Sequence, residues 1–562
     1  MHIRKLGYST YRFLEKHPFL AYFIIAQGFL ILSNLPLILR IMRTPAGWIF
    51  PLLHFDWPHD YYLYLSGIVQ GQKGAYLFHD PYTSEVTSSS VIYILFVILG
   101  RINSILQLWP PVIYHVYRLI IAEIYLLLIF WLNKEFFRKF SLFVGSIFSL
   151  TFSLSPLIVV QALLNHQFIL PNLIPWWISM DALERLNDLP HYLTGNTLFL
   201  LSILFLFRYS RSKKLTHLFG SILTAFIAGI FQPSSILPLI IIIPMSVSFN
   251  LIKIIIVKKR FPIIDFKSAL ILLIPVFALL SILVIQHQSN LGFPWNSAYS
   301  PWLVARWNQL ELGFDRDLML SISIPILFLL PCIVYFVRRG SWKILFLICL
   351  ALFPLIILPF VNILGIPKIY LVRNPLLIPY AIILILFIKD NAYFIHRKYI
   401  STSILMLIFL LSITSSVLIL SVRLRYIVSE TIDDNPLWPQ VYIRESTYSA
   451  IKQACFLIPE NSVVLSKARA GNILPAFCPV ISYLGHMNQT MNFSDKERNV
   501  ERFYSMKLTD DEAFELLKTG RIDYVYDGLE EKQLHPKNLD YPNLETVIST
   551  NNFTLYRTNL NK

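Results

Sequence analysis

About eleven apolar segments, each near the ~20 residues that a helix needs to cross ~30 Å of hydrocarbon, constrain this chain more than any other feature. They begin near residues 18, 112, 141, 191, 215, 235, 268, 318, 343, 369 and 400. Because 55% of the residues are hydrophobic and only 14% are charged, the composition is typical of a polytopic membrane protein. No small-residue cleavage site follows the first span, so we interpret it as a retained anchor.

The distribution of Lys and Arg predicts the side of the membrane that each loop occupies. With a cytoplasmic N-terminus, inner segments such as "NKEFFRK" carry roughly twice as many basic residues as the outer loops. An odd number of spans then places the C-terminal part outside the cytoplasm. The net charge of +15 belongs to the membrane part, because residues 423–562 carry slightly more acids than bases. Topology therefore accounts for the basicity, and we expect no nucleic-acid partner.

One apolar segment needs a different interpretation. Residues 91–108, "VIYILFVILGRINSILQL", are hydrophobic enough to cross, but they contain Arg101 and Asn103, and a crossing here would turn "NKEFFRK" outward. We interpret this segment as a helix lying in the outer interface of the membrane. The first outer loop then covers residues 43–111, which is long for a connection and favours a functional role.

The predicted fold class is a polytopic α-helical membrane protein with a C-terminal extracytoplasmic α/β domain. Residues 1–422 form the transmembrane domain and residues 423–562 the soluble domain. In the latter we expect helices at 438–456, 494–506 and 509–520, strands from Ser462 and at 522–526, and a terminal strand pair at 544–550 and 553–558. The helix at 509–520 opens with a Thr cap and acids in its first turn.

Several familiar catalytic patterns are absent from the sequence. It contains no Walker loop, no G-x-G-x-x-G after a strand, no G-x-S-x-G and no H-E-x-x-H, so energy from nucleotide hydrolysis is not expected. Cys332 and Cys349 lie in spans, whereas Cys455 and Cys478 lie in the C-terminal part. This spacing excludes a cysteine zinc cluster and leaves at most a disulfide between Cys455 and Cys478.

The first outer loop concentrates acids, histidines and tyrosines in "HFDWPHDYYLYLSGIVQGQKGAYLFHDPYTSE", residues 54–85. An acid at the mouth of a hydrophobic bundle could act as general base for an acceptor hydroxyl or as ligand to a divalent metal. That chemistry suits transfer of a sugar from a lipid phosphate. The alternative is a merely polar outer loop whose aromatic residues sit in the interfacial belt.

These elements resemble the GT-C type of integral-membrane glycosyltransferase. The resemblance lies in "DWPHDYYLYLSGIVQGQKGAY", the interfacial segment after it, and the span "VIYHVYRLIIAEIYLLLIFWLNKEFFRK". It is similar to polyprenyl-phosphate-sugar-dependent members such as protein mannosyltransferases and the aminoarabinose transferase of lipid A. The chain looks closer still to a poorly characterised bacterial group, which shares "QG…G…LFH(N/D)P(Y/F)T(S/A)E" from Gln70 to Glu85, "LPHYL" at Leu189, "GH…QT…F…K" from Gly485 to Lys496, and "IDYVYDG" at Ile522.

The resemblance implies a catalytic acid in the first outer loop, which falls on Asp60 or Asp56. Asp60 is preferred because it directly precedes the Tyr-rich helix and keeps the offset to Gln70. Where the family often has adjacent acids, His59 stands beside Asp60, which leaves metal dependence open. A second acid on the next long outer loop would be Asp181, with Glu184 behind it; the alternative is surface charge on a short amphipathic helix. Asp60 and Asp181 are the candidate ligands if a divalent metal ion takes part.

A polyprenyl-phosphate donor requires a cation near the outer surface, and Arg373 in "IYLVRNP" and His191 after Pro190 are the candidates. The alternative for Arg373 is an interfacial side chain that reaches toward the headgroups. Glu123, within the second span, is expected to pair with Arg118 or to line a cavity. The C-terminal domain would recognise the acceptor or cover the catalytic mouth as a lid. Predicted contacts to the acceptor or within the loop are His59, Tyr61, Tyr62 and His486.

The sequence thus predicts a plasma-membrane glycosyltransferase that moves a sugar from a polyprenyl-phosphate donor to an extracytoplasmic glycan, lipid or protein acceptor. One alternative is a transporter or flippase of lipid-linked glycans, and another is a non-catalytic envelope assembly protein. Transporters usually place ionisable groups at the bilayer midplane and break helices in paired halves. Only Glu123 and Arg118 meet the first criterion, and no half-to-half repeat is visible, which favours an enzyme.

Overall fold

The computed structural model describes residues 11–55, 57–164, 179–258, 271, 274–277, 279–281, 284, 292–295, 313–364, 366–391, 398–432, 438–535 and 538–560. The chain divides into two compact units. The helical unit comprises Met1–Pro36, Arg118–Ile285 and Leu310–Tyr426. The mixed unit comprises Leu37–Tyr117, Gln286–Gln309 and Ile427–Lys562. The domain boundary after residue 422 stays a prediction.

Nine helices in the described part of the chain are long and apolar enough to cross a membrane, so the chain is a multi-pass membrane protein. They account for nine of the eleven predicted spans. The span predicted near residue 215 is α10 (Leu215–Phe231), which is shorter than the nine, with 17 residues. The span predicted near residue 268 lies largely outside the described residues.

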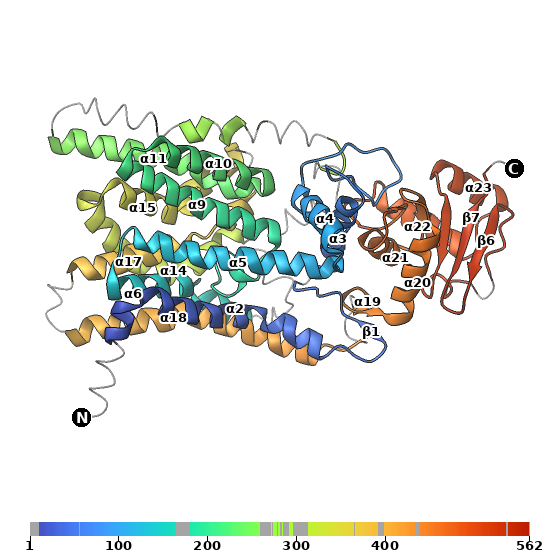
Figure 1. Ribbon diagram of the computed structural model, residues 1–562, viewed down its shortest axis with the longest axis horizontal. Helices are drawn as coiled ribbons and strands as arrows, with labels where there is room; N and C mark the ends of the chain where they lie inside the picture. Colours follow the sequence, from blue (N-terminus) through green and yellow to red (C-terminus); the bar gives the residue numbers. More distant parts are fainter. Residues whose placement is uncertain are drawn as a thin grey trace. The chain divides into compact units, whose positions relative to one another are not determined.

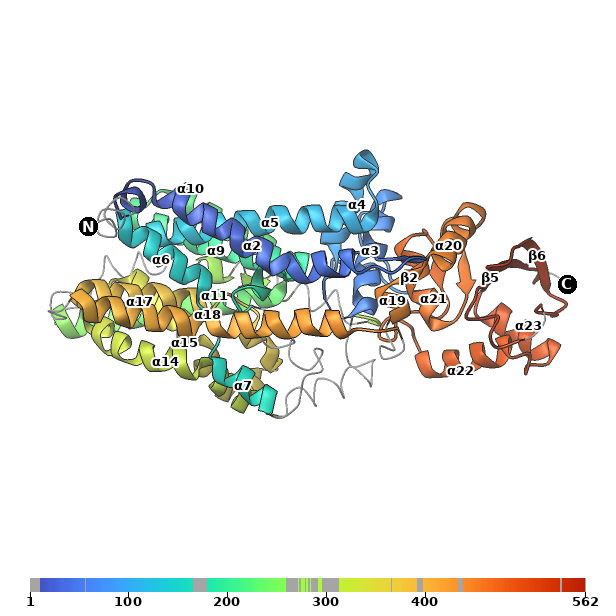
Figure 2. The ribbon, with the colours of Figure 1, turned by 90° about the horizontal axis from the view of Figure 1, so that it is seen from below.

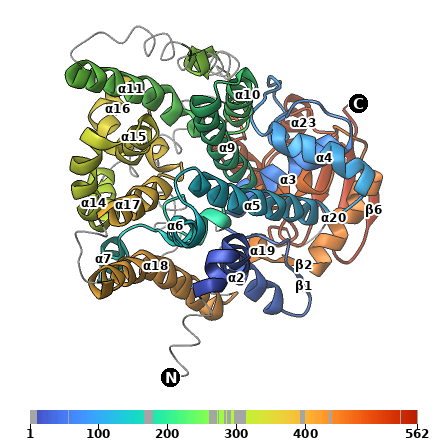
Figure 3. The ribbon, with the colours of Figure 1, turned by 60° about the vertical axis from the view of Figure 1, so that its left-hand side comes forward.

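The remaining α-helices that belong wholly or partly to the helical unit are α2 (Pro18–Met42), α5 (Pro110–Lys134), α6 (Lys139–Thr151), α7 (Pro156–Leu164), α9 (Pro190–Ser212), α11 (Pro233–Lys258), α14 (Phe314–Arg339), α15 (Trp342–Ile357), α16 (Val361–Leu364), α17 (Leu377–Asn391) and α18 (Lys398–Ser429). Short 3-10 turns are η1 (Glu184–Leu186), η3 (Leu358–Phe360) and η4 (Lys368–Val372). Helices α9, α10 and α11 run side by side, and α17 packs against α6 and α15 (Figure 1, Figure 3).

Glu123 and Arg118, inside the helical unit, both bond to amide side chains. The Gln27 amide donates to a Glu123 carboxylate oxygen at 2.9 Å. Arg118 is fully buried and donates to Asn34 and, at 2.8 Å, to the side chain of Asn187. Glu123 and Arg118 therefore bond to amide side chains rather than forming the predicted ion pair, which avoids leaving either charge unsolvated among apolar helices.

Residues 43–111, predicted to be the first outer loop, fold within the mixed unit around two helices, α3 (Pro58–Gln72) and α4 (Ile94–Leu106). Helix α4 covers most of the segment predicted to lie in the interface, and its 13 residues are fewer than a membrane crossing needs. The two helices meet at Gly71 and Gly100, where a Cβ on either residue would overlap a backbone carbonyl oxygen of the other helix. Two glycines thus permit the close backbone contact.

The C-terminal part of the mixed unit contains a five-stranded sheet in the order β4-β3-β5-β7-β6. The strands β3 (Val463–Leu465), β4 (Ile481–Ser482) and β5 (Tyr524–Asp527) are parallel, whereas β7 (Thr554–Thr558) is antiparallel to β5 and to β6 (Leu544–Ser549). Helices α22 (Phe493–Tyr504) and α23 (Asp510–Thr519) pack on one face of this sheet (Figure 2). Their shared core includes Leu465, Phe503, Leu517 and Val525.

The predicted elements of this region are confirmed with one exception. Thr509 and Glu512 form the expected N-terminal cap of α23, each side chain accepting the other's backbone N–H. The helix predicted at 438–456 is instead α19 (Trp438–Val441), the short strand β2 (Ile443–Arg444) and α20 (Glu445–Leu457). The interruption arises because β2 pairs antiparallel with β1 (Trp48–Ile49). The remaining helical segments are α21 (Ala468–Ile473) and η5 (Leu474–Ala476).

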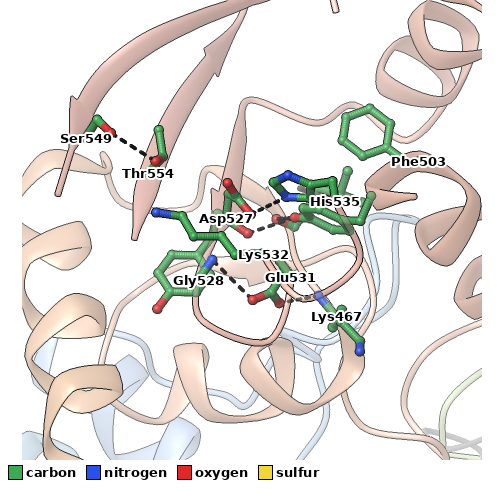
Figure 4. Close-up of polar contacts among 12 residues, drawn as sticks. Lys467, Phe503, Asp527, Gly528, Glu531, Lys532, His535, Ser549 and Thr554 are labelled. Atoms are coloured by element: carbon green, nitrogen blue, oxygen red, sulfur yellow. Dashed lines mark hydrogen bonds and ion pairs between the residues drawn. The ribbon is translucent and has the colours of Figure 1, made fainter. Parts of the chain in front are cut away.

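A disulfide and the hydrogen bonds of two buried carboxylates also hold this region together. Cys455 and Cys478 form the disulfide that the sequence left open, with Cα atoms 5.3 Å apart. At the carboxyl end of β5, buried Asp527 accepts a hydrogen bond from His535 Nε2 at 3.0 Å (Figure 4). Nearby, Glu531 accepts the backbone N–H of Lys467 at 2.9 Å and that of Gly528 at 3.2 Å (Figure 4). Glu531 thereby joins the segment after β3 to the segment after β5.

Candidate functional site

Asp60 lies in the first turn of α3 in the mixed unit. Trp57 precedes the helix and Pro58 occupies its first turn, where proline's fixed φ favours helix initiation. A carboxylate in the first turn is stabilised by the unpaired backbone N–H groups of the helix N-terminus. The Asp60 side chain is 45% exposed, so one face of its carboxylate is accessible to a substrate.

His486 is the side chain that holds Asp60. Its Nε2 lies 3.0 Å from Asp60 Oδ1, and its Nδ1 accepts the backbone N–H of Asn488 at 3.1 Å. Because Nδ1 is occupied as an acceptor, Nε2 carries the proton and donates to the carboxylate. With only 2% of its side chain exposed, His486 has a fixed orientation, and Asp60 is fixed with it.

Aromatic groups complete the surroundings of this pair. The His59 ring lies 6.1 Å from the His486 ring, and the Tyr82 ring lies 5.8 Å from it. Burial, and next the neighbouring His486, lower the pKa of His59 to about 4. His59 is therefore a neutral side chain at neutral pH and adds no positive charge beside Asp60.

Two motifs that are far apart in the sequence meet here. Thr490 donates to the backbone carbonyl of Tyr82 at 2.7 Å and accepts the N–H of Gly485 at 3.1 Å. Lys496 pairs with Glu85 at 2.7 Å. A Cβ at Gly485 would lie 2.7 Å from the Tyr82 ring, so glycine is required for this contact. The "LFHDPYTSE" and "GH…QT…F…K" segments thus pack together and position His486.

The predicted tyrosine contacts face inward. The Tyr61 hydroxyl donates to the carbonyl of Pro51 at 2.7 Å, and that of Tyr62 donates to the carbonyl of Gln440. Both side chains are fully buried and anchor α3 within the mixed unit. Their role toward an acceptor stays a prediction, and Asp56 lies outside the described residues. Tyr82 is a neighbour of the candidate acid that sequence reasoning missed, although the motif around it was recognised.

Asp181 lies in the helical unit and is fully buried. Its Oδ1 accepts the N–H groups of Leu183 and Glu184 at 3.0 and 2.9 Å. Its Oδ2 accepts the hydroxyls of Ser153 and Ser416 at 3.0 and 2.6 Å. Four bonds to one carboxylate cap the η1 turn and join separate segments, so Asp181 is not a surface charge. Its catalytic assignment stays a prediction.

Arg373 and His191 gather around one aromatic ring of the helical unit. The Arg373 guanidinium carbon lies 4.5 Å from the centroid of the Tyr192 ring, and the His191 ring lies 4.4 Å from that ring. Arg373 Nε is buried and donates to no acceptor among the described residues. Burial raises the pKa of Asp188 to about 7, against the opposing effect of Arg373. The two predicted phosphate-binding residues are therefore neighbours.

The groups around Asp60 do not fit a divalent metal site in this arrangement. Within the described ranges, no three His, Cys, Asp or Glu side chains are grouped so that they could hold a metal ion. His486 presents its N–H rather than a lone pair to Asp60, and a protonated nitrogen is not a ligand. The metal-binding assignments of Asp60 and Asp181 stay predictions, and no step below uses a metal.

The fold defines the class of protein as a multi-pass helical membrane protein with a C-terminal mixed α/β region. No protein-family model matches the chain, and no curated protein matches it. Among solved structures it is similar to the oligosaccharyltransferase of Archaeoglobus fulgidus in the apo form, with 14% identity, a TM-score of 0.47 and coverage of 90% of this chain and 70% of the other.

Further oligosaccharyltransferase structures from the same archaeon give similar values. One, tethered to an acceptor peptide with the NVT sequon, gives 15% identity, a TM-score of 0.46 and coverage of 93% and 70%. Another, in complex with an inhibitory peptide and a dolichol-phosphate, gives 13% identity, a TM-score of 0.44 and coverage of 90% and 70%. At these identities and TM-scores, nothing about activity follows from the likeness.

Proposed function

We propose that this protein is a GT-C-type glycosyltransferase that moves a sugar from a polyprenyl-phosphate donor to an acceptor on the extracytoplasmic side, with the Asp60 carboxylate as its catalytic base. The observation that carries the proposal is the Asp60–His486 pair, a partly exposed carboxylate held at 3.0 Å by a buried histidine. The GT-C-like pattern of the first outer loop, on which Asp60 lies, supports it further. The N-terminus would be cytoplasmic and residues 423–562 extracytoplasmic.

In the proposed reaction, an acceptor oxygen attacks the anomeric carbon of the donor while the bond from that carbon to the phosphate oxygen breaks. The polyprenyl phosphate leaves with the electron pair, and the acceptor proton passes to Asp60. His486 donates to the other oxygen of Asp60 throughout, so the carboxylate keeps its orientation as its charge changes. The neutral His59 leaves the Asp60 carboxylate free of a competing cation and available to accept the proton.

The departing phosphate needs positive charge, for which Arg373 and His191 are the proposed source. With the pKa of Asp188 at about 7, this carboxyl is partly protonated at neutral pH and only partly compensates the charge of Arg373. That leaves the guanidinium able to pair with a phosphate. Arg373 and Asp60 belong to different units, and the substitution of Arg373 tests its role separately from that of Asp60.

The test is transfer of radiolabelled sugar from a panel of polyprenyl-phosphate sugars to a membrane and cell-wall extract by the purified full-length protein. Wild type should transfer from at least one donor. Asp60→Asn should abolish transfer, while the matched control Asp495→Asn, at an exposed carboxylate in α22, should leave it unchanged. Arg373→Gln should weaken use of the donor. Asp56→Asn and Asp181→Asn decide whether either remaining acid takes part.

Two results would overturn the proposal. If every donor stays untouched while the protein moves labelled lipid across liposomes, the protein is a transporter of lipid-linked glycans. If Asp60→Asn folds and transfers sugar at the wild-type rate, Asp60 is not the catalytic base. Circular dichroism and size-exclusion chromatography of each variant establish that loss of transfer is not loss of folding.

A further inference from the structure

A second feature of the mixed unit is a cavity of about 590 Å³ that lies apart from Asp60. Its walls come from residues 69–87 of the first outer loop, residues 460–463 and 475–481, and Arg521. This volume lies within the roughly 300–1,000 Å³ range of small-molecule binding sites. Neither Asp60 nor His486 lines it, so the proposed catalytic pair leaves the cavity unexplained.

Asp80 is the buried polar group of this cavity. It is 5% exposed, and its Oδ1 accepts the backbone N–H of Tyr82 at 3.0 Å. Its Oδ2 is buried and has no hydrogen-bond partner in the part of the chain that the structure describes. Burial raises the pKa of Asp80 well above its usual value. Burial thus favours the neutral form of this carboxyl, which reduces the negative charge on this wall of the cavity.

Of the charged groups on the cavity wall, Lys73, Glu460 and Glu85 are compensated by ion pairs, whereas Arg521 has no ion pair among the described residues. Lys73 pairs with Glu460 at 2.7 Å, and Glu85 pairs with Lys496 at 2.7 Å. The wall also carries uncharged hydroxyl and amide groups, alternating with apolar surface from valine and proline side chains: Ser84, Thr87 and Asn461, with Val69, Val480 and Pro479. Neutral hydrogen-bonding groups beside small apolar patches match the hydroxyls and C–H faces of a sugar better than they match an ion.

We propose that this cavity binds a short uncharged oligosaccharide, the glycan part of the acceptor. The role as acceptor site rests on the proposed function, whereas the binding itself does not. The connection to the catalytic pair is direct in the chain, because Asp80 and Thr83 line the cavity and Tyr82 between them contacts His486. A ligand in the cavity would therefore contact the segment that positions Asp60.

The experiment measures binding of neutral trisaccharides (maltotriose, cellotriose, mannotriose and chitotriose) to the full-length protein in nanodiscs by saturation-transfer difference NMR. Glucuronate-containing trisaccharides serve as charged comparison ligands. Wild type should bind at least one neutral trisaccharide. Ser84→Trp fills the cavity and should weaken binding at least about tenfold, whereas Ser88→Trp, on the same loop but outside the lining, should not. Asp80→Asn keeps an uncharged side chain of the same shape and should bind like wild type.

Each outcome decides the proposal. Binding of no neutral trisaccharide, preference for the charged ligands, or unchanged binding by Ser84→Trp overturns it. If Ser84→Trp does not fold, Thr87→Trp on the same wall takes its place. Asp60→Asn should bind like wild type, so lost transfer with retained binding separates the two proposals. If wild type binds a neutral trisaccharide and the Trp variants lose that binding but still transfer sugar normally to every acceptor, the cavity is a glycan site but not the acceptor site.

Discussion

At the scale of single residues, the arrangement of His486 and Asp60 predicts a kinetic effect. His486→Phe removes the N–H donor while keeping a ring, and the misoriented carboxylate should lower kcat of sugar transfer about 100-fold with little change in KM. His486→Gln keeps a donor and should recover part of that loss. His217→Phe, in the first turn of α10, is the matched control. A rise in KM without a fall in kcat would instead assign His486 to substrate binding.

Glu531 predicts a pH dependence of stability. Burial raises the pKa of this carboxyl to about 8, so the folded state holds a proton that the unfolded chain releases near its ordinary pKa of 4.5. The stability from that proton is complete below about pH 4.5 and is lost as the pH rises through 8. Glu531→Gln is close in shape to the protonated carboxyl and should remove this loss.

The corresponding measurement is the thermal midpoint of wild type and variant at pH 5 and pH 8. From pH 5 to pH 8, the free energy of unfolding of Glu531→Gln should rise relative to that of wild type by more than about 1.4 kcal/mol, the equivalent of one pKa unit. Glu545→Gln changes an exposed carboxylate of β6 that does not act on the pKa of Glu531, and it should show no such gain. Equal pH dependence of wild type and Glu531→Gln would mean that Glu531 is ionised in the folded protein.

At the scale of elements, the crossing of α3 and α4 depends on Gly71 and Gly100. Gly100→Ala forces a methyl group into the backbone of α3 at Ile68 and should destabilise the protein by about 1–3 kcal/mol. It should also lower transfer, because α3 carries Asp60. Gly28→Ala in α2, where a Cβ would contact nothing within 4 Å, should be neutral or slightly stabilising. The thermal midpoints of the two glycine variants in detergent measure this difference. Equal midpoints would mean that α3 and α4 do not cross at Gly71 and Gly100.

The elements also show which predictions the sequence supports. The cap of α23 is local, with Thr509 three residues before Glu512, so its pattern is visible in the sequence. The break at Tyr442 is not, because it depends on pairing of β2 with Trp48 and Ile49. Likewise Asp60 was identified by its own motif, but its bond to His486 joins residues 426 positions apart. The sequence places Asp181 on a long outer loop, and its hydrogen bonds to Ser153 and Ser416 become visible only in the folded structure.

At the scale of the whole molecule, orientation is the property on which the proposed function depends. The additional segments are the predicted spans near residues 215 and 268. The number of spans is nine if neither crosses the membrane and eleven if both cross, and both numbers are odd. In either case the two ends of the chain lie on opposite sides of the membrane. The distribution of Lys and Arg then favours an inner N-terminus. Since the donor chemistry is proposed on the outer side, a reversed orientation would place residues 423–562 in the cytoplasm and remove the basis for an extracytoplasmic acceptor.

Single introduced cysteines can decide the orientation, because Cys332 and Cys349 are buried and Cys455 is bonded to Cys478. Lys213→Cys, at the exposed end of α9, should react with a membrane-impermeant maleimide in right-side-out vesicles only after permeabilisation. Lys507→Cys, exposed after α22, should react without it. The opposite pattern would reverse the topology. Reaction of both cysteines in sealed vesicles would mean an even number of crossings between residues 213 and 507, so that one of the additional segments alone spans the membrane.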